Sequence, residues 1–204
     1  NLTTRSFFGA LAYDGIAMPN CVDVDGDGDL DCFVGSASGE VAYWHNTGSD
    51  DEANFVLASP SIFNDTGVDL GAFAAPFCTT SQSFATPSSM LICLVGAVDG
   101  TVLSLNATWN KTSELPYFNE KSVLQKDTFG QADSSKSEAR PFCADFDDDG
   151  DLDCLVGDKY GYVSYAENTG SSWDVSEEYF NGERFAGGNT AVVRTAPFCF
   201  DVDN

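Results

Sequence analysis

Apolar and polar residues alternate along three short stretches of the chain. The stretches are residues 39–44 (Gly-Glu-Val-Ala-Tyr-Trp), 100–105 (Gly-Thr-Val-Leu-Ser-Leu) and 161–165 (Gly-Tyr-Val-Ser-Tyr). Alternation with a period of two, bounded by Gly and Asn, predicts short antiparallel β-strands joined by turns. Gly, Ser, Thr, Asn and Asp interrupt every window that could form a helix. We therefore expect an all-β fold.

These stretches belong to a repeat that runs through the whole chain. Each follows a segment that starts with Pro-x-Cys and ends with Cys-x-Val-Gly, at residues 19–35, 76–96 and 141–157. Further aromatic residues complete each period, so one period holds about four strands, the content of one β-propeller blade. The predicted organisation is the tail of a preceding repeat (1–18), repeat 1 (19–75), repeat 2 (76–140), repeat 3 (141–196) and the start of a further repeat (197–204).

Repeats 1 and 3 each contain an aspartate-rich loop. The pattern Asp-x-Asp-x-Asp-Gly-x-x-Asp occupies residues 23–31, the first aspartate loop, and residues 145–153, the second aspartate loop. A tight turn makes such carboxylates converge, and Ca²⁺ prefers roughly six to eight hard oxygen ligands. We predict two structural Ca²⁺ sites. The side-chain ligands are Asp23, Asp25, Asp27 and Asp31 in the first loop and Asp145, Asp147, Asp149 and Asp153 in the second, with the carbonyls of Asp29 and Asp151 as further ligands.

Other interpretations of these loops fit the sequence less well. A solvated acidic turn without a metal is the simplest alternative, but two loops repeat the same spacing. Mg²⁺ keeps its waters and prefers fewer protein ligands, and an EF-hand needs flanking helices and Glu at position 12, where this chain has Val34 and Val156. Repeat 2 has no carboxylate between its cysteines, so we expect no metal there. Asp201 and Asp203 begin a partial loop of the same kind.

The cysteines bracket these loops in pairs. Their spacing suits no zinc knuckle, and pairing within each repeat is the most economical of the fifteen ways to join six cysteines. The expected disulfides are Cys21–Cys32, Cys78–Cys93 and Cys143–Cys154. Cys199 would need a partner beyond residue 204. Persistent disulfides indicate an oxidising compartment.

Four Asn-x-Ser/Thr sequons begin at Asn1, Asn64, Asn106 and Asn110. Together with the disulfides they favour a secreted or cell-surface glycoprotein that carries N-linked glycans.

Charge and composition narrow the classes of function. The chain has 204 residues, with 32 acidic and 9 basic side chains and a formal net charge of −23. This balance argues against a nucleic-acid partner, whose phosphates need a basic surface. No apolar run approaches the roughly 18 residues of a membrane span. The single histidine, His45, excludes most hydrolytic triads and is expected to lie on the surface of a strand.

The aspartate loops and their flanks resemble the FG-GAP/VCBS repeat family, the calcium-loop repeats of integrin-α-type β-propellers. The resemblance rests on Pro-x-Cys-x-Asp-x-Asp-x-Asp-Gly-Asp-Leu-Asp-Cys-x-Val-Gly, followed by Tyr-x-x-Asn-Thr-Gly, and covers essentially the whole chain in three units. It implies four-stranded antiparallel blades, in a β-propeller or a propeller-like open array, with Ca²⁺ bound by the aspartates named above. The cysteines stand where the family usually has apolar residues, and repeat 2 lacks the acids.

We expect a non-enzymatic extracellular module, stabilised by calcium and disulfides, that serves a structural, adhesive or filament-forming role. Its partners would be further repeats or copies of itself, in a homo-polymer or a larger propeller, or an extracellular protein or glycan. The alternative is a carbohydrate-binding, lectin-like propeller that uses exposed Trp44, Trp109 or Trp173. An accessory domain of a secreted enzyme is a third, weaker expectation.

Overall fold

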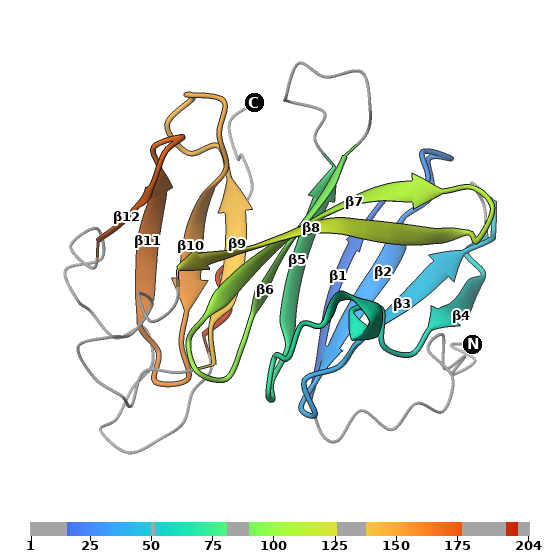
Figure 1. Ribbon diagram of the computed structural model, residues 1–204, viewed down its shortest axis with the longest axis horizontal. Coiled ribbons are helices and arrows are strands. Elements are labelled where there is room, and N and C mark those ends of the chain that lie inside the picture. Colours follow the sequence, from blue (N-terminus) through green and yellow to red (C-terminus); the bar gives the residue numbers. More distant parts are fainter. Residues whose placement is uncertain (1–15, 50–51, 81–89, 126–137, 177–194, 200–204) are drawn as a thin grey trace, which may run out of the picture.

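The computed structural model describes residues 16–49, 52–80, 90–125, 138–176 and 195–199. These residues form three four-stranded antiparallel sheets (Figure 1). Sheet 1 consists of β1 (Ala17–Val22), β2 (Asp31–Ser36), β3 (Val41–Asn46) and β4 (Phe55–Ser59). Sheet 2 consists of β5 (Ala75–Thr80), β6 (Leu91–Gly96), β7 (Val102–Asn110) and β8 (Leu115–Gln125). Sheet 3 consists of β9 (Arg140–Ala144), β10 (Asp153–Gly157), β11 (Val163–Asn168) and β12 (Trp173–Ser176).

The sequence-based prediction of an all-β fold is confirmed. The helical structure in the described ranges is limited to one short 3₁₀ turn, η1 (Asn64–Thr66). In each sheet the strands pair in chain order, and the first strand starts one or two residues before the predicted repeat boundary. One repeat therefore makes one four-stranded sheet.

Cysteine pairs link the first two strands of every sheet. The strand register places Cys21 opposite Cys32, and the same holds for the cysteines of sheets 2 and 3. The structure joins Cys21 to Cys32, Cys78 to Cys93 and Cys143 to Cys154, which is the pairing expected from the sequence. Cys199 is exposed and forms no disulfide with a described residue.

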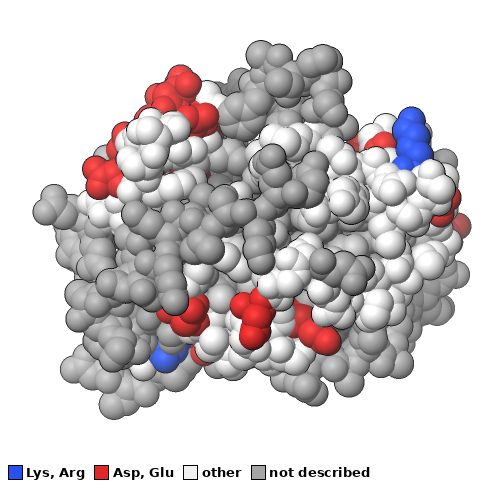
Figure 2. Space-filling model, in the orientation of Figure 1, with Lys and Arg blue, Asp and Glu red and all other residues white. Residues whose placement is uncertain are grey.

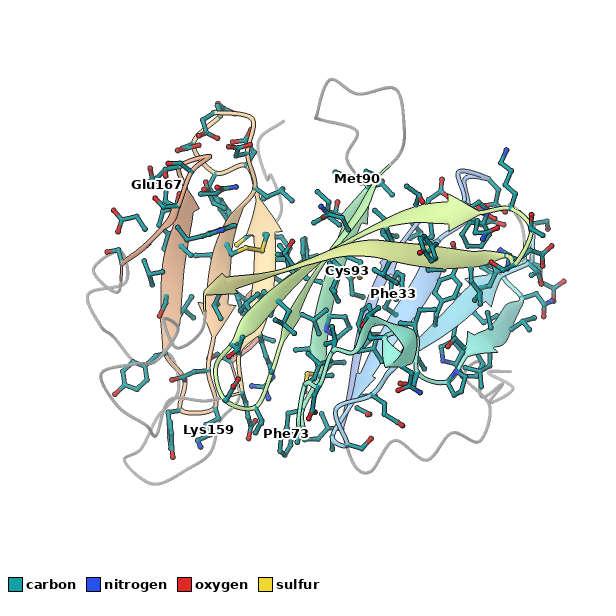
Figure 3. The ribbon with its side chains drawn as sticks, viewed as in Figure 1. Phe33, Phe73, Met90, Cys93, Lys159 and Glu167 are labelled. Carbon is teal, nitrogen blue, oxygen red and sulfur yellow. A yellow bond between two sulfur atoms is a disulfide. The ribbon has the colours of Figure 1, made fainter. Side chains whose placement is uncertain are left out.

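The hydrophobic core lies between successive sheets and follows the alternation of side chains along the second strands. On β2, Phe33 faces sheet 2, whereas Cys32 and Val34 belong to a separate cluster on the other face. On β6 the cysteine Cys93 packs with Phe33 between sheets 1 and 2 (Figure 3), and Leu94 faces sheet 3. Sheets 2 and 3 thus turn their Cys-x-Val side chains toward the preceding sheet, and sheet 1 turns its own to the face away from sheet 2. Complete burial of a Phe, Leu or Val side chain in such a core contributes about 1.5–3 kcal/mol to stability.

At each junction between repeats the backbone passes close to a glycine at or next to the end of the second strand of the preceding sheet. A Cβ on Gly35 would lie 2.0 Å from the carbonyl oxygen of Ala74, a distance no side chain tolerates. Gly96 meets Ala139 in the same way, and Gly157 meets Thr195. The junctions explain why the Cys-x-Val-Gly motif ends in glycine, since only glycine allows so close an approach.

The long hairpin of β7 and β8 extends over sheet 1 (Figure 1). Its rings contact those of sheet 1 and the segment after it: Trp109 lies 6.4 Å from Tyr43, and Phe118 lies 4.9 Å from Phe63, between centroids. Sheet 2 is therefore packed on both of its neighbours. The first strand β5 lies against β1 and β2 on one side and β9 on the other.

Candidate metal centres

The two aspartate loops connect the first and second strands of sheets 1 and 3. Both lie at the upper edge of the molecule in Figure 1, and Figure 2 shows acidic side chains gathered over the loop between β9 and β10. The corresponding loop of sheet 2, residues 81–89, lies outside the described residues. So do Asp201, Asp203 and the sequon at Asn1. The two described loops occupy equivalent places in their sheets.

Three predicted ligands converge in each loop. One carboxylate oxygen from each of three aspartates lies within 4.8 Å of the other two. The members are Asp23, Asp25 and Asp27 in the first loop and Asp145, Asp147 and Asp149 in the second. Positions 1, 3 and 5 of the motif therefore form the same cluster twice.

Hydrogen bonds from backbone amides to the aspartates fold the first loop. The two carboxylate oxygens of Asp23 accept the N–H groups of Gly26 at 2.8 Å and Gly28 at 3.1 Å, and Asp25 accepts that of Asp27 at 3.1 Å. Aspartate side chains commonly fold the following backbone back in this way. The turn is therefore closed by the same carboxylates that converge.

The second loop closes by the same rule. Asp145 accepts the N–H groups of Asp149 at 3.2 Å and Gly150 at 3.0 Å. Position 4 adopts positive φ in both loops, 81° at Gly26 and 62° at Asp148. Aspartate is among the few residues besides glycine that adopt this conformation readily, so the second loop accommodates an extra carboxylate there.

The aspartates at position 9, Asp31 and Asp153, lie beneath the loops and not in the clusters. They are 1% and 0% exposed. The oxygens of Asp31 accept the N–H groups of Val24 at 3.2 Å and Asn46 at 2.7 Å. Asp153 is bonded to Phe146 and Asn168 in the equivalent way, at 3.3 Å and 2.8 Å. These two predicted ligands therefore fasten each loop to the Asn-Thr-Gly turn that follows the third strand.

The aspartates at position 7 also stand apart from the clusters. Asp29 donates its N–H to Asp27 at 2.9 Å, and Asp151 donates to Asp149 at 2.9 Å. The side chain of Asp151 is half-buried and lines a groove together with Asn168. The predicted role of Asp29 and Asp151 as carbonyl ligands stays a prediction.

Burial and neighbouring charge oppose ionisation of two of these carboxyls, those of Asp31 and Asp147. Burial raises the pKa of Asp31, although hydrogen bonds from the Asn46 and Val24 amides lower it in part. Desolvation, together with the carboxylates of Asp149, Asp153 and Asp145, raises the pKa of Asp147. A bound divalent cation would relieve this repulsion, because it stabilises the ionised carboxylates.

Sequence analysis missed the role of His45. Its side chain is only 12% exposed, and its Nε2 atom lies 3.2 Å from the Asp25 carboxylate, so the prediction of a surface residue is wrong. The His45 ring also contacts Trp109 of sheet 2, with 5.4 Å between centroids. No signal in the sequence marked this contact, because Asp25 and His45 are twenty residues apart.

The structure also corrects the prediction of exposed tryptophans. Trp44 is buried in the cluster on the outer face of sheet 1, and Trp109 and Trp173 are half-buried against the cores between the sheets. Among the described residues no helix is long and apolar enough to cross a membrane.

The donor set of each cluster fits a hard divalent cation. All three converging groups are carboxylates, the oxygen ligands that Ca²⁺ takes in proteins, whereas soft metals prefer thiolate or imidazole. No protein-family model matches the chain, and neither a curated protein nor a solved structure gives a significant match.

Proposed function

We propose that this protein is a non-enzymatic extracellular glycoprotein built from calcium-stabilised repeats of FG-GAP/VCBS type. The observation that carries the proposal is the convergence of the same three carboxylates in two separate loops. Each loop is also closed at its base by a disulfide between the strands that it connects. Disulfides are typical of proteins in oxidising, extracellular compartments.

The proposed role of the cation is structural. Each cluster brings together three carboxylates that repel one another, and the buried aspartate beneath it connects the loop to the third strand. A cation in the cluster would therefore hold the first, second and third strands of a sheet together at one edge. Binding that occurs only in the folded state stabilises that state.

Calcium titration of metal-free protein tests this proposal. We expect two Ca²⁺ ions to bind, and we expect chelation to lower the melting temperature by several degrees, since a ligand at 100 times its Kd adds about 2.7 kcal/mol. Mg²⁺ at the same concentration should restore less stability, because it exchanges its waters reluctantly. A melting curve that is identical with Ca²⁺ and after its verified removal would contradict the proposal.

The proposed arrangement is a β-propeller or a propeller-like open array. Three sheets with the same strand order pack in sequence, and equivalent junctions join them. At the third junction, the segment 195–199 meets sheet 3 in the same way as the segment leading into β5 meets sheet 1. The Thr195 amide donates to the carbonyl of Asp158 at 3.0 Å, as the Ala74 amide donates to the carbonyl of Ser36 at 3.1 Å. The repeated junction supports a further sheet in the same series.

The proposed partners are further repeats of this kind, in the same polypeptide or in other copies that form a filament. The rings of Phe77, Phe142 and Phe198 contact edge to face in series, with centroids 5.3 Å and 5.5 Å apart. Phe198 is 77% exposed. Sedimentation and imaging of the purified protein test assembly between copies. Phe198→Asp should weaken assembly, whereas Tyr117→Asp, at an exposed position on β8, should not; a chain that stays monomeric at every concentration would contradict a filament.

A further inference from the structure

A shallow groove separates sheet 2 from the second aspartate loop. Its volume is about 240 Å³. Sheet 2 contributes the apolar side chains of Met90, Ile92 and Leu94, and Met90 lies at the upper end of that sheet in Figure 3. The remaining lining residues are Ser104 and Asn106 of β7, Asp151 and Leu152 of the second aspartate loop, and Asn168 of β11. The groove therefore has apolar walls and several polar groups.

One wall of this groove carries the asparagine of a sequon. Asn106 begins the sequence Asn-Ala-Thr, lies on β7 and is half-buried. The other two sequon asparagines in the described ranges differ, because Asn64 in η1 and Asn110 at the end of β7 are both exposed. The Asn110 side chain instead accepts the Thr112 amide at 2.9 Å in the turn that follows. A glycan on Asn106 would begin inside the groove, whereas glycans on the other two would begin in solvent.

The groove suits a single sugar ring. It is smaller than the roughly 300–1,000 Å³ of pockets that hold drug-sized ligands. A pyranose has an apolar C–H face, which Ile92, Leu94 and Leu152 can cover, and a polar rim. The side chains of Ser104, Asp151 and Asn168 provide hydrogen-bonding groups for that rim.

We propose that Asn106 carries an N-linked glycan whose first sugar lies in this groove and fastens sheet 2 to the second aspartate loop. The proposal rests on the proposed function, which places the chain in the secretory pathway. In the transfer step the Asn106 amide nitrogen bonds to the anomeric carbon of a lipid-diphosphate-linked oligosaccharide. The bond from that carbon to the diphosphate breaks, and the amide proton leaves with the lipid carrier.

The contact has a consequence for the candidate metal centre. Asp151 follows the converging carboxylates of the second loop and donates its N–H to Asp149, so a sugar against Asp151 and Leu152 restrains that loop. In the first aspartate loop, Asp25 instead contacts His45, whose ring lies against Trp109. The glycan on Asn106 therefore acts on the second centre.

Native deglycosylation tests the proposal. The chain is secreted from a eukaryotic host, treated with an N-glycosidase while folded, and analysed by peptide mapping in ¹⁸O-labelled water. We expect the glycans of Asn64 and Asn110 to be released from the folded protein and that of Asn106 to be released only after denaturation. Release of the Asn106 glycan from folded protein as fast as that of Asn110 would overturn the contact with the groove.

Two sequon variants give a matched comparison, since neither changes an asparagine. Thr108→Ala removes the sequon of Asn106, and Thr112→Ala removes that of Asn110; both threonines are exposed. We expect Thr108→Ala to lower the melting temperature of the secreted protein by about 2–4 °C and Thr112→Ala to leave it unchanged. The Thr108→Ala effect should vanish in protein made by a host that does not glycosylate.

The outcomes separate this inference from the function on which it rests. Glycans on Asn64 and Asn110 with a bare Asn106 would overturn the groove inference and leave the secreted glycoprotein intact. A secreted protein in which all four sequons are bare would overturn both. Equal melting temperatures for the two threonine variants would also overturn the structural role of the Asn106 glycan.

Discussion

The two aspartate loops contain the same converging carboxylates in different surroundings. In the first loop, Asp25 contacts His45, and position 4 is Gly26. In the second loop, Glu167 occupies the place of His45 before the Asn-Thr-Gly turn (Figure 3), and Asp148 takes the place of Gly26. The hydrogen-bonded turn therefore determines the cluster, while the charge around the cluster differs between the two loops.

The loops differ beneath the cluster as well. Tyr43 and Tyr165 occupy equivalent positions on the third strands, but only the Tyr165 hydroxyl donates to the buried aspartate, at 3.0 Å to Asp153. The Tyr43 hydroxyl is buried close to Asp31 but makes no hydrogen bond of ordinary distance and angle to a described residue. The buried aspartate beneath the second loop therefore accepts one more hydrogen bond than the one beneath the first loop.

The largest expected effect comes from removing the buried aspartates. Asp31→Ala and Asp153→Ala each leave two backbone N–H groups without their acceptor, and each buried orphaned donor costs about 1–3 kcal/mol. Urea unfolding should show losses of about 2–5 kcal/mol. Asp153→Ala should lose more, because it also removes the hydrogen bond that the Tyr165 hydroxyl donates.

A matched pair of phenylalanine variants isolates that difference. Tyr165→Phe removes a hydroxyl that is bonded, so it should destabilise the protein, whereas Tyr43→Phe removes a buried hydroxyl that makes no such bond to a described residue and should be neutral or stabilising. If both variants lost the same free energy of unfolding, the proposed difference between the hydrogen bonding of Asp31 and that of Asp153 would be contradicted.

The pH dependence of stability should invert when calcium is removed. A carboxyl whose pKa is raised in the folded state binds protons more tightly when folded, as for Asp31 and Asp147. The metal-free protein should therefore gain this contribution as the pH falls through the raised pKa toward the ordinary value of 3.8, and lose it as the pH rises. Bound Ca²⁺ keeps the carboxylates ionised, so the calcium form should lose stability in acid.

Melting temperatures at a series of pH values from 7 down to 3.8 measure this effect, with metal-free protein prepared before the pH is changed. The stabilisation by Ca²⁺ should shrink as the pH falls toward 3.8. A stabilisation that stays the same across the whole series would show that these carboxylates do not couple to the cation.

The smallest expected effect is a difference in affinity between the two sites. Calcium titration of the Asp25→Ala variant measures the affinity of the second loop alone, and titration of the Asp147→Ala variant measures that of the first loop. The extra carboxylates of Asp148 and Glu167 should make the second loop bind about two- to fivefold more tightly, which corresponds to roughly 0.5–1 kcal/mol at a solvated surface. A tighter first loop would show that His45 and the glycines favour binding more than the added charge does.

Strand content, the repeat and the converging positions were predictable because they depend on local sequence. Alternation of side chains along residues 39–44 and 161–165 marks strands, and the spacing of the aspartates determines which carboxylates a tight turn brings together. The cysteine pairing was predictable for the same reason, because Cys21 and Cys32 bracket one hairpin. In each case the residues that interact are close in the chain.

The tertiary structure decided what depends on contacts between distant residues. The sequence could not separate Asp31 from the clustered aspartates, because its partner amide, that of Asn46, lies fifteen residues away. The sequence could not predict that Trp44 is buried or that His45 contacts Asp25 and Trp109, because those contacts form only when β3 and sheet 2 are packed together. Nor could it distinguish Asn106 from Asn110, four residues apart on one strand, because the groove forms only where sheet 3 meets sheet 2. Periodicity specifies which face a side chain takes within its own sheet, and only the packing of sheets specifies what that face meets.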